Sequence, residues 1–158
     1  MKEKKLKVVW LCHFVNDELN DYFGIQLDEL SRWMDAFFSI VRGDSRLDIH
    51  VVAPNYWTNE DTEVRLRGIT YHLYKYHFVN IRKLISFELV FSKERAVQKK
   101  IHHIIQEIAP DVIHLFGSEN IGYSCGIIPY AKNKNVVISL QGFVNRTQDK
   151  VCFPRNII

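Results

Sequence analysis

Residues 111–122 constrain the fold more than any other part of the sequence. Within them, Val112–Phe116 is apolar at every position except His114. An apolar run of this length, following a helix-like segment, is typical of a strand buried on both faces of a parallel sheet. Gly117 ends the run, and a helix is expected to follow. Ligands of open α/β sheets bind at the carboxyl ends of the strands, so the turn 117–120 is the first candidate for a binding site.

The rest of the chain alternates between strand-like and helix-like patterns. The predicted strands are 5–12, 47–53, 68–76, 112–116 and 136–140. The predicted helices are 27–41, 92–108 and 119–132. This order predicts an α/β fold, a Rossmann-like three-layer sandwich with a mostly parallel central sheet.

Three other segments complete this prediction. Residues 13–24 are polar and acidic and are predicted as a loop, and 55–67 are predicted to be irregular. The alternation within 68–76 leaves one half-exposed face, which favours a position near the sheet edge. From residue 144 onward the pattern dissolves without a closing helix. We therefore expect the chain to be one domain of a longer protein.

Two neighbouring segments allow more than one interpretation. Residues 78–91 are rich in large apolar side chains, with Arg82 and Lys83 among them. They are expected to cover the sheet, but they could also face a lipid-linked acceptor or a bilayer. The helix 92–108 buries an isoleucine stripe and crowds its other faces with basic residues. Those residues indicate a solvated helix face or, as the alternative, peripheral contact with anionic lipid.

The composition narrows the class of protein. A chain of 158 residues with 47% hydrophobic residues is long enough for one domain with a real core. The net charge of +3 is too mild to indicate a nucleic-acid partner. The three cysteines are odd in number and widely spaced, which favours buried free thiols in a reducing cytosol. The N-terminus lacks the apolar core of a signal peptide or membrane span, so a cytoplasmic protein is expected, with the inner face of the membrane as an alternative location.

Several common chemistries lack their motifs. No G-x-G-x-x-G follows the first strand and no P-loop pattern occurs, so no dinucleotide cofactor is expected. No H-E-x-x-H is present, and the adjacent His102 and His103 would point about 100° apart on a helix, so no metal site is expected. The G-x-S-x-G motif of a hydrolase nucleophile elbow is also absent, so the sequence does not indicate a hydrolase.

What remains is a set of polar residues at one predicted sheet edge, each directly after a strand. Amides, carboxylates and imidazoles make directional hydrogen bonds of the kind that sugar hydroxyls need. Glu119 and Asn120 could instead serve only a helix N-terminus. Gln141 and Gly142 could be only a turn, and His114 is expected to be a hydrogen-bonded core residue. The predicted substrate-binding residues are His13, Asn16, Ser118, Glu119, Asn120, Gln141 and Gly142.

At these same turns the sequence resembles the N-terminal half of a family 4 glycosyltransferase of the GT-B type. The resemblance is carried by Val-Val-Trp-Leu-Cys-His-Phe near the start, Trp33, residues 110–119 and residues 136–143. It implies two Rossmann-like domains facing a cleft, with this chain (1–158) as the acceptor-side domain and the donor domain absent from it. It also implies sugar transfer with retained anomeric configuration. The implied partners are a nucleotide-sugar donor and a cell-surface glycan or lipid-linked acceptor.

Two departures from that family pattern stand out. Many relatives carry a glycine pair after the first strand, whereas 13–24 contains only Gly24. Many carry a histidine where Gln141 stands, and a glutamine cannot act as a general base at neutral pH. Since the family's paired glutamates belong to the C-terminal half, we expect this chain alone to transfer no sugar. The alternative function is a stand-alone α/β module that binds a sugar or nucleotide, with association with a membrane surface as an open alternative.

Overall fold

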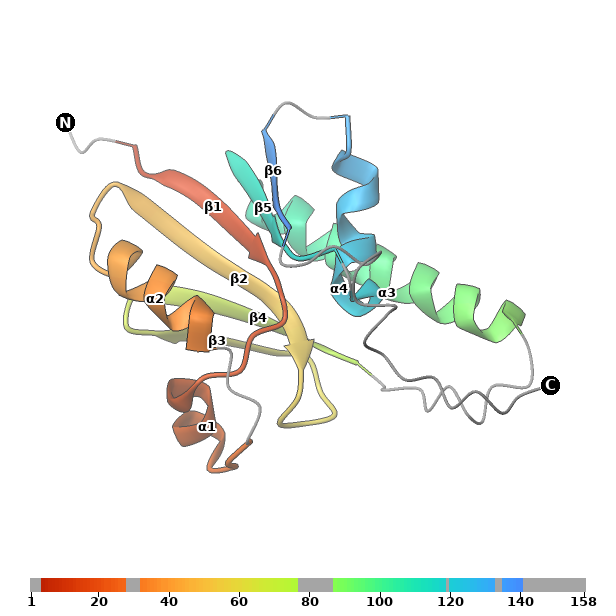
Figure 1. Ribbon diagram of the computed structural model, residues 1–158, viewed down its shortest axis with the longest axis horizontal. Helices are drawn as coiled ribbons and strands as arrows, with labels where there is room; N and C mark the ends of the chain where they lie inside the picture. Colours follow the sequence, from red (N-terminus) through yellow and green to blue (C-terminus); the bar gives the residue numbers. More distant parts are fainter. Residues whose placement is uncertain (1–3, 28–31, 77–86, 119, 133–134, 141–158) are drawn as a thin grey trace, which may run out of the picture.

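The computed structural model describes residues 4–27, 32–76, 87–118, 120–132 and 135–140. Over these residues the protein forms a three-layer α/β sandwich around one sheet (Figure 1). The strands are β1 (Leu6–Leu11), β2 (Leu47–Asn55), β3 (Thr62–Leu66), β4 (Ile69–Lys75), β5 (Val112–Phe116) and β6 (Val136–Ser139). The helices are α1 (Asp17–Phe23), α2 (Arg32–Val41), α3 (Phe87–Ile108), the short α4 (Ile121–Ser124) and the 3-10 helix η2 (Cys125–Tyr130).

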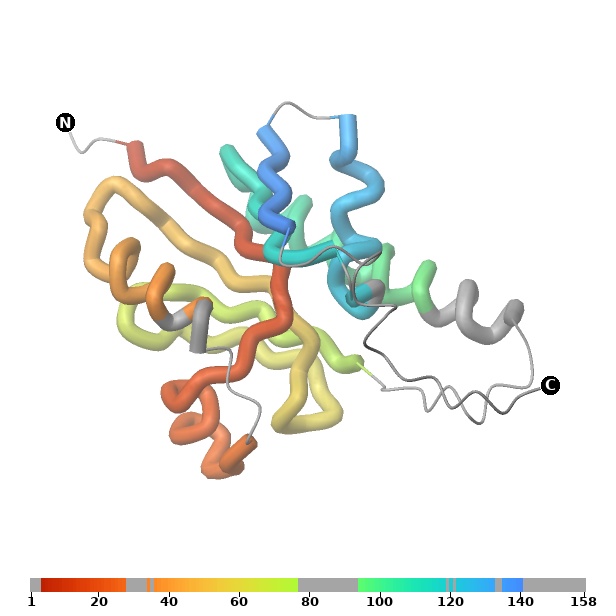
Figure 2. Tube along the Cα trace, viewed as in Figure 1, coloured from red at the N-terminus to blue at the C-terminus, as the bar shows by residue number. Residues whose placement is uncertain are grey.

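The sheet has the order β3-β4-β2-β1-β5-β6, and every neighbouring pair is parallel except β3 and β4. The chain therefore builds outward from β1 on one side, then returns to place β5 and β6 on the other side (Figure 2). The predicted fold class is confirmed. The strand order reverses between β1 and β5, which is where doubly wound sheets place their ligands.

Alternating side chains of β1 feed two separate cores. Trp10 packs with Met34 and Phe38 of α2 on one face of the sheet. Val9 and Leu11 face the other way, in a cluster that includes the isoleucines of α3. All of these β1 side chains are at most 5% exposed, because helices cover both faces of a central parallel strand. The predicted isoleucine stripe of α3 is confirmed, with Ile101, Ile105 and Ile108 buried.

The predicted loop 13–24 is wrong in part, because it contains α1. Asn16 has extended backbone and its side chain accepts a hydrogen bond from the Leu19 N–H at 2.9 Å, which caps the helix. Gly24 ends the helix in the left-handed region, at φ 65°. The helix was missed because it is short and polar and buries few residues.

The prediction that 55–67 is irregular is also wrong, because β3 lies within it. β3 and β4 form a hairpin whose two turn residues, Arg67 and Gly68, have φ of 42° and 89°. Positive φ at both positions is the type I′ geometry that suits the twist of a two-stranded hairpin. β3 occupies the sheet edge, so β4 is buried on both faces rather than half exposed.

The predicted helix 119–132 is replaced by two shorter turns. α4 covers only Ile121–Ser124, and the chain then tightens into η2, which contains Pro129. A proline lacks the N–H that a continuous α-helix needs, which favours the change of helix type. α3 begins at Phe87, earlier than the predicted 92–108, and residues 77–86 lie outside the described part of the chain.

Two further expectations are met within the described residues. Cys12 and Cys125 are buried free thiols, while Cys152 lies outside the described part. No described helix has the length and apolar character needed to cross a bilayer.

Asn55 holds the loop that leads from β2 to β3. Its Nδ2 donates to the Thr58 hydroxyl and the Glu60 carbonyl, both at 2.8 Å, and its Oδ1 accepts from the Trp57 and Thr58 amides. We expect Asn55→Ala to lower the free energy of unfolding by about 2–4 kcal/mol, because these four hydrogen bonds are lost and the buried Trp57 amide is left without its acceptor. Urea unfolding measures this loss. Asn59→Ala, at an exposed position of the same loop, is the control and should change it by less than about 0.5 kcal/mol.

Candidate functional site

The candidate site is the sheet edge formed by the carboxyl ends of β1, β2 and β5. β1 pairs with β5 so that Leu11 lies opposite Leu115, and with β2 so that Leu11 lies opposite Val52. The residues that leave these three strands therefore start from the same edge. His13 follows β1, Tyr56 follows β2, and Ser118 follows β5. This edge includes the point at which the strand order reverses.

His13 and Tyr56 form the closest polar contact at this edge. The His13 Nδ1 lies 2.6 Å from the Tyr56 hydroxyl, and the two ring centroids are 4.7 Å apart in an edge-to-face arrangement. Both residues are half-buried. Each thus combines a polar atom with an aromatic surface, and both remain accessible.

The asparagines of the candidate set build the local backbone. Asn16 is 5% exposed and caps α1. Asn120 is exposed, and its side chain accepts from the Gly122 N–H at 2.9 Å at the start of α4. Ser118 is exposed beside Gly117, whose amide donates to the Ser139 carbonyl of β6 at 2.8 Å. The turn after β5 is therefore fixed by β6 on one side and by the cap of α4 on the other.

Tyr74 of β4 and Tyr76, which directly follows β4, both reach the same turn. The Tyr74 hydroxyl donates to the Gly122 carbonyl at 2.6 Å. Tyr76 lies so close that a Cβ added at Gly122 would meet its ring and hydroxyl at 2.9 Å. Burial raises the pKa of Tyr76 above its ordinary value, so its phenol stays protonated. Only glycine allows this approach of α4 to the tyrosines.

The structure brings together the described members of the predicted set at one edge. His13 and Asn16 follow β1, and Ser118 and Asn120 follow β5. Glu119, Gln141 and Gly142 lie outside the described residues. Their predicted roles stay predictions.

Two aromatic residues of this edge were missed in the sequence. Tyr56 fell within a segment that was predicted to be irregular, and Tyr76 was placed only at the end of a strand. The signal that could have found both is their position, because each comes directly after the carboxyl end of a strand.

His114 of β5 and the two histidines of α3 also have local partners. The Nε2 of His114 lies 2.8 Å from the Ser139 hydroxyl, and burial lowers the pKa of this imidazole. His102 contacts the Tyr130 hydroxyl at 2.8 Å, whereas His103 faces Glu107 at 3.5 Å. In the described part of the chain, no group of three or more His, Cys, Asp or Glu residues is arranged to hold a metal ion.

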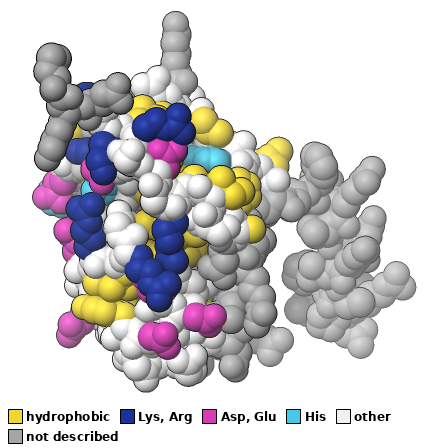
Figure 3. All heavy atoms as spheres, turned by 90° about the vertical axis from the view of Figure 1, so that its left-hand side faces the viewer, with side chains coloured by type: hydrophobic (Ala, Val, Ile, Leu, Met, Phe, Trp, Pro, Cys, Tyr) yellow, Lys and Arg dark blue, Asp and Glu magenta, His cyan; other side chains and the backbone are white. Residues whose placement is uncertain are grey.

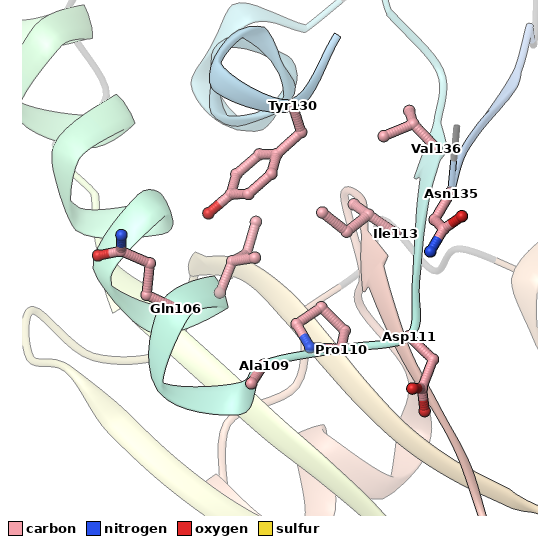
Figure 4. Close-up of a pocket in the computed structure, with 9 residues that line it drawn as sticks. Gln106, Ala109, Pro110, Asp111, Ile113, Tyr130, Asn135 and Val136 are labelled. Carbon is pink, nitrogen blue, oxygen red and sulfur yellow. The ribbon is translucent and has the colours of Figure 1, made fainter. Parts of the chain in front are cut away.

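A hollow of about 420 Å³ lies at the opposite edge, near the amino ends of β5 and β6 (Figure 4). Tyr130 reaches into it from η2, and Ile113 and Val136 line it from the two strands. Asp111 points away from the hollow, and its carboxylate accepts from the Lys7 amide at 2.9 Å. Its wall is mixed, with Gln106 and Asn135 beside the apolar residues, and the Tyr130 hydroxyl lies 2.8 Å from the His102 Nδ1.

Charges are interleaved rather than gathered on the side of the molecule drawn in Figure 3. On α3, Arg95 and Lys99 are exposed, while Lys100 is paired with Asp61 at 2.7 Å. This pairing favours the interpretation of α3 as a solvated helix face. Most of the apolar segment 78–91 lies outside the described residues.

The groups at the carboxyl edge can bind hydroxyls but are poorly suited to nucleophilic chemistry. The imidazole, phenol, hydroxyl and amide groups there can both donate and accept hydrogen bonds. The nearest thiol, Cys12, is fully buried, and burial raises its pKa above the ordinary value. Comparison with known proteins finds no matching family model and no matching curated protein.

The close approach at Gly122 is open to a direct test. We expect Gly122→Ala to destabilise the protein by about 1–3 kcal/mol, because the new methyl group would overlap Tyr76 and the Asn120 cap. Thermal unfolding monitored by circular dichroism measures the change. Ser124→Ala, on the same short helix, is the control. Equal stabilities of the two variants would contradict this account of the turn.

Proposed function

We propose that this chain is the acceptor-side domain of a retaining glycosyltransferase of the GT-B type. In this proposal the carboxyl edge of the sheet binds a cell-surface glycan or a lipid-linked acceptor. A second domain holds the nucleotide-sugar donor. The observation that carries the proposal is the convergence of His13, Tyr56, Ser118 and Asn120 at the edge where the strand order reverses.

The chemistry of this edge favours a sugar over a phosphate. A sugar offers hydroxyls to directional donors and acceptors, and its apolar ring face packs on aromatic side chains. His13 and Tyr56 supply both features within one contact of 2.6 Å. The loop after β1 is not glycine-rich, the Asn16 side chain caps the Leu19 amide, and Asp17 and Glu18 place negative charge in the first turn of α1. These features favour an acceptor sugar here and a donor phosphate elsewhere.

The two outermost strands of the sheet, β3 and β6, differ in a way that supports further packing against β6. β3, at one edge, carries the charged residues Glu63 and Arg65, which discourage pairing with another strand. β6, at the other edge, contains no charged residue, and its Val137 and Ile138 are 48% and 50% exposed. Adjacent strand residues point to opposite faces, so both faces of β6 present apolar surface. Such a strand is suited to contact with additional protein.

Glycan binding tests the site itself. The probe is an array of neutral and acidic oligosaccharides from cell-surface polysaccharides, and the readout is affinity by calorimetry for the glycans retained. We expect Tyr56→Phe to weaken binding about 3- to 10-fold, the loss of one hydrogen bond to the sugar, with a small fall in unfolding temperature because His13 also loses its partner. Tyr22→Phe is the matched control, because Tyr22 is 50% exposed on α1. Unchanged affinity of Tyr56→Phe would place the sugar elsewhere.

Turnover tests the division of labour. Incubated with nucleotide sugars and an acceptor glycan that it binds, the purified 158-residue chain should release no nucleotide above the rate of spontaneous hydrolysis. The reason is that the donor and the catalytic carboxylates belong to the second domain in this proposal. Mass spectrometry of the acceptor is the measurement. Transfer that scales with the concentration of this chain would refute the assignment.

A further inference from the structure

Four titratable side chains form a continuous row across β2, β4 and β3. His50 on β2 and His72 on β4 are in direct contact, with the His50 Nδ1 2.9 Å from the His72 Nε2. The other nitrogen of His50 lies 3.4 Å from Asp48, and the other nitrogen of His72 lies 3.1 Å from Glu63. Both imidazoles are at most 14% exposed, whereas the carboxylates of Asp48 and Glu63 are 29% and 69% exposed.

The number of hydrogens that this row needs indicates the charge of the histidine pair. The row contains three contacts, and each needs one hydrogen between its two heavy atoms. Two neutral imidazoles carry only two N–H groups, so one contact would join two lone pairs. An imidazole and an imidazolium together carry three N–H groups, one for each contact. A fourth hydrogen would set two N–H groups against each other across the 2.9 Å contact.

We propose that His50 and His72 form a proton-binding site that holds a single shared positive charge, balanced by Asp48 and Glu63. In this arrangement His50 donates from both nitrogens, to Asp48 and to His72. His72 accepts at Nε2 and donates from Nδ1 to Glu63. The site lies on the α3 face of the sheet and is independent of the carboxyl edge and of its proposed function.

The surrounding charges favour this occupancy. Asp48 faces the pair from β2 and Glu63 from β3, and Glu107 acts on His72 from α3 while it also contacts His103. Other charged groups on the elements around the pair are Arg65 on β3, Lys75 on β4, and Glu94, Arg95, Lys99 and Lys100 on α3, with Lys100 held by Asp61. Burial lowers the pKa of His72, which keeps this ring as the neutral acceptor of the pair. The excess charge therefore resides on His50.

The pair should make stability depend on pH in both directions. In the unfolded chain each imidazole titrates independently near pH 6.5. In the folded chain the first proton is held to higher pH and the second is resisted to lower pH. The contribution to stability is therefore greatest near pH 6.5 and is lost as the pH rises through the upper transition or falls through the lower one.

Nitrogen-15 NMR of the full chain, labelled at histidine, tests the proposal by counting protonated ring nitrogens. At neutral pH we expect hydrogen on three of the four nitrogens of His50 and His72, with only the His72 Nε2 bearing a lone pair. Two protonated nitrogens, one on each ring, would overturn the proposal. If three nitrogens are protonated, as proposed, a pH titration should show one transition above and one below the ordinary imidazole range.

A second measurement uses variants that leave both imidazoles in place. Glu63→Gln removes a carboxylate that is 69% exposed, so the fold should tolerate the change. We expect its upper transition to move down by about one pH unit, because an opposing charge near the pair is lost. Glu60→Gln makes the same chemical change at an exposed position outside the row and should move it by less than about 0.2 units. Equal titration curves for the two variants would overturn the proposal.

Discussion

The structure depends on the burial of β1 between two parallel neighbours. Because β1 is central, its alternate side chains fill both cores, as Trp10 does on one face and Leu11 on the other. The start of β5 is tied to it twice, since Asp111 donates its amide to the Lys7 carbonyl and accepts the Lys7 amide on its carboxylate. With β1 and β5 held in register, the turns that follow them must emerge together. The geometry of the candidate site is therefore a consequence of the core.

The two turns are built by different means. After β1 the chain enters a helix whose cap, Asn16, is buried, and this leaves His13 to meet Tyr56 from β2. After β5 the short helix α4 lies against β4, because the Gly122 carbonyl accepts a hydrogen bond from Tyr74 and the missing side chain leaves room for Tyr76. Rigid backbone thus surrounds a small number of accessible polar side chains. A fixed frame of this kind can hold polar side chains in place for the proposed acceptor sugar.

The sequence was most informative where burial is complete. The runs that became β1 and β5 were predicted because a strand covered on both faces has little freedom in composition. β3 was missed although its residues alternate, because it is only five residues long, carries charge and lies within a polar segment. Tyr56 was missed because its significance depends on the neighbouring strand. His50 and His72 are separated by 22 positions, and only the register of β2 against β4 brings them into contact.

The central claim is that an acceptor sugar binds at the carboxyl edge, where β1 and β5 end. Amide chemical-shift mapping on the labelled chain tests this most directly, using an oligosaccharide that the protein retains. The account predicts shifts confined to residues that follow β1, β2 and β5, among them His13, Tyr56 and Ser118. Shifts confined to the hollow near Tyr130, at the opposite edge, would contradict it.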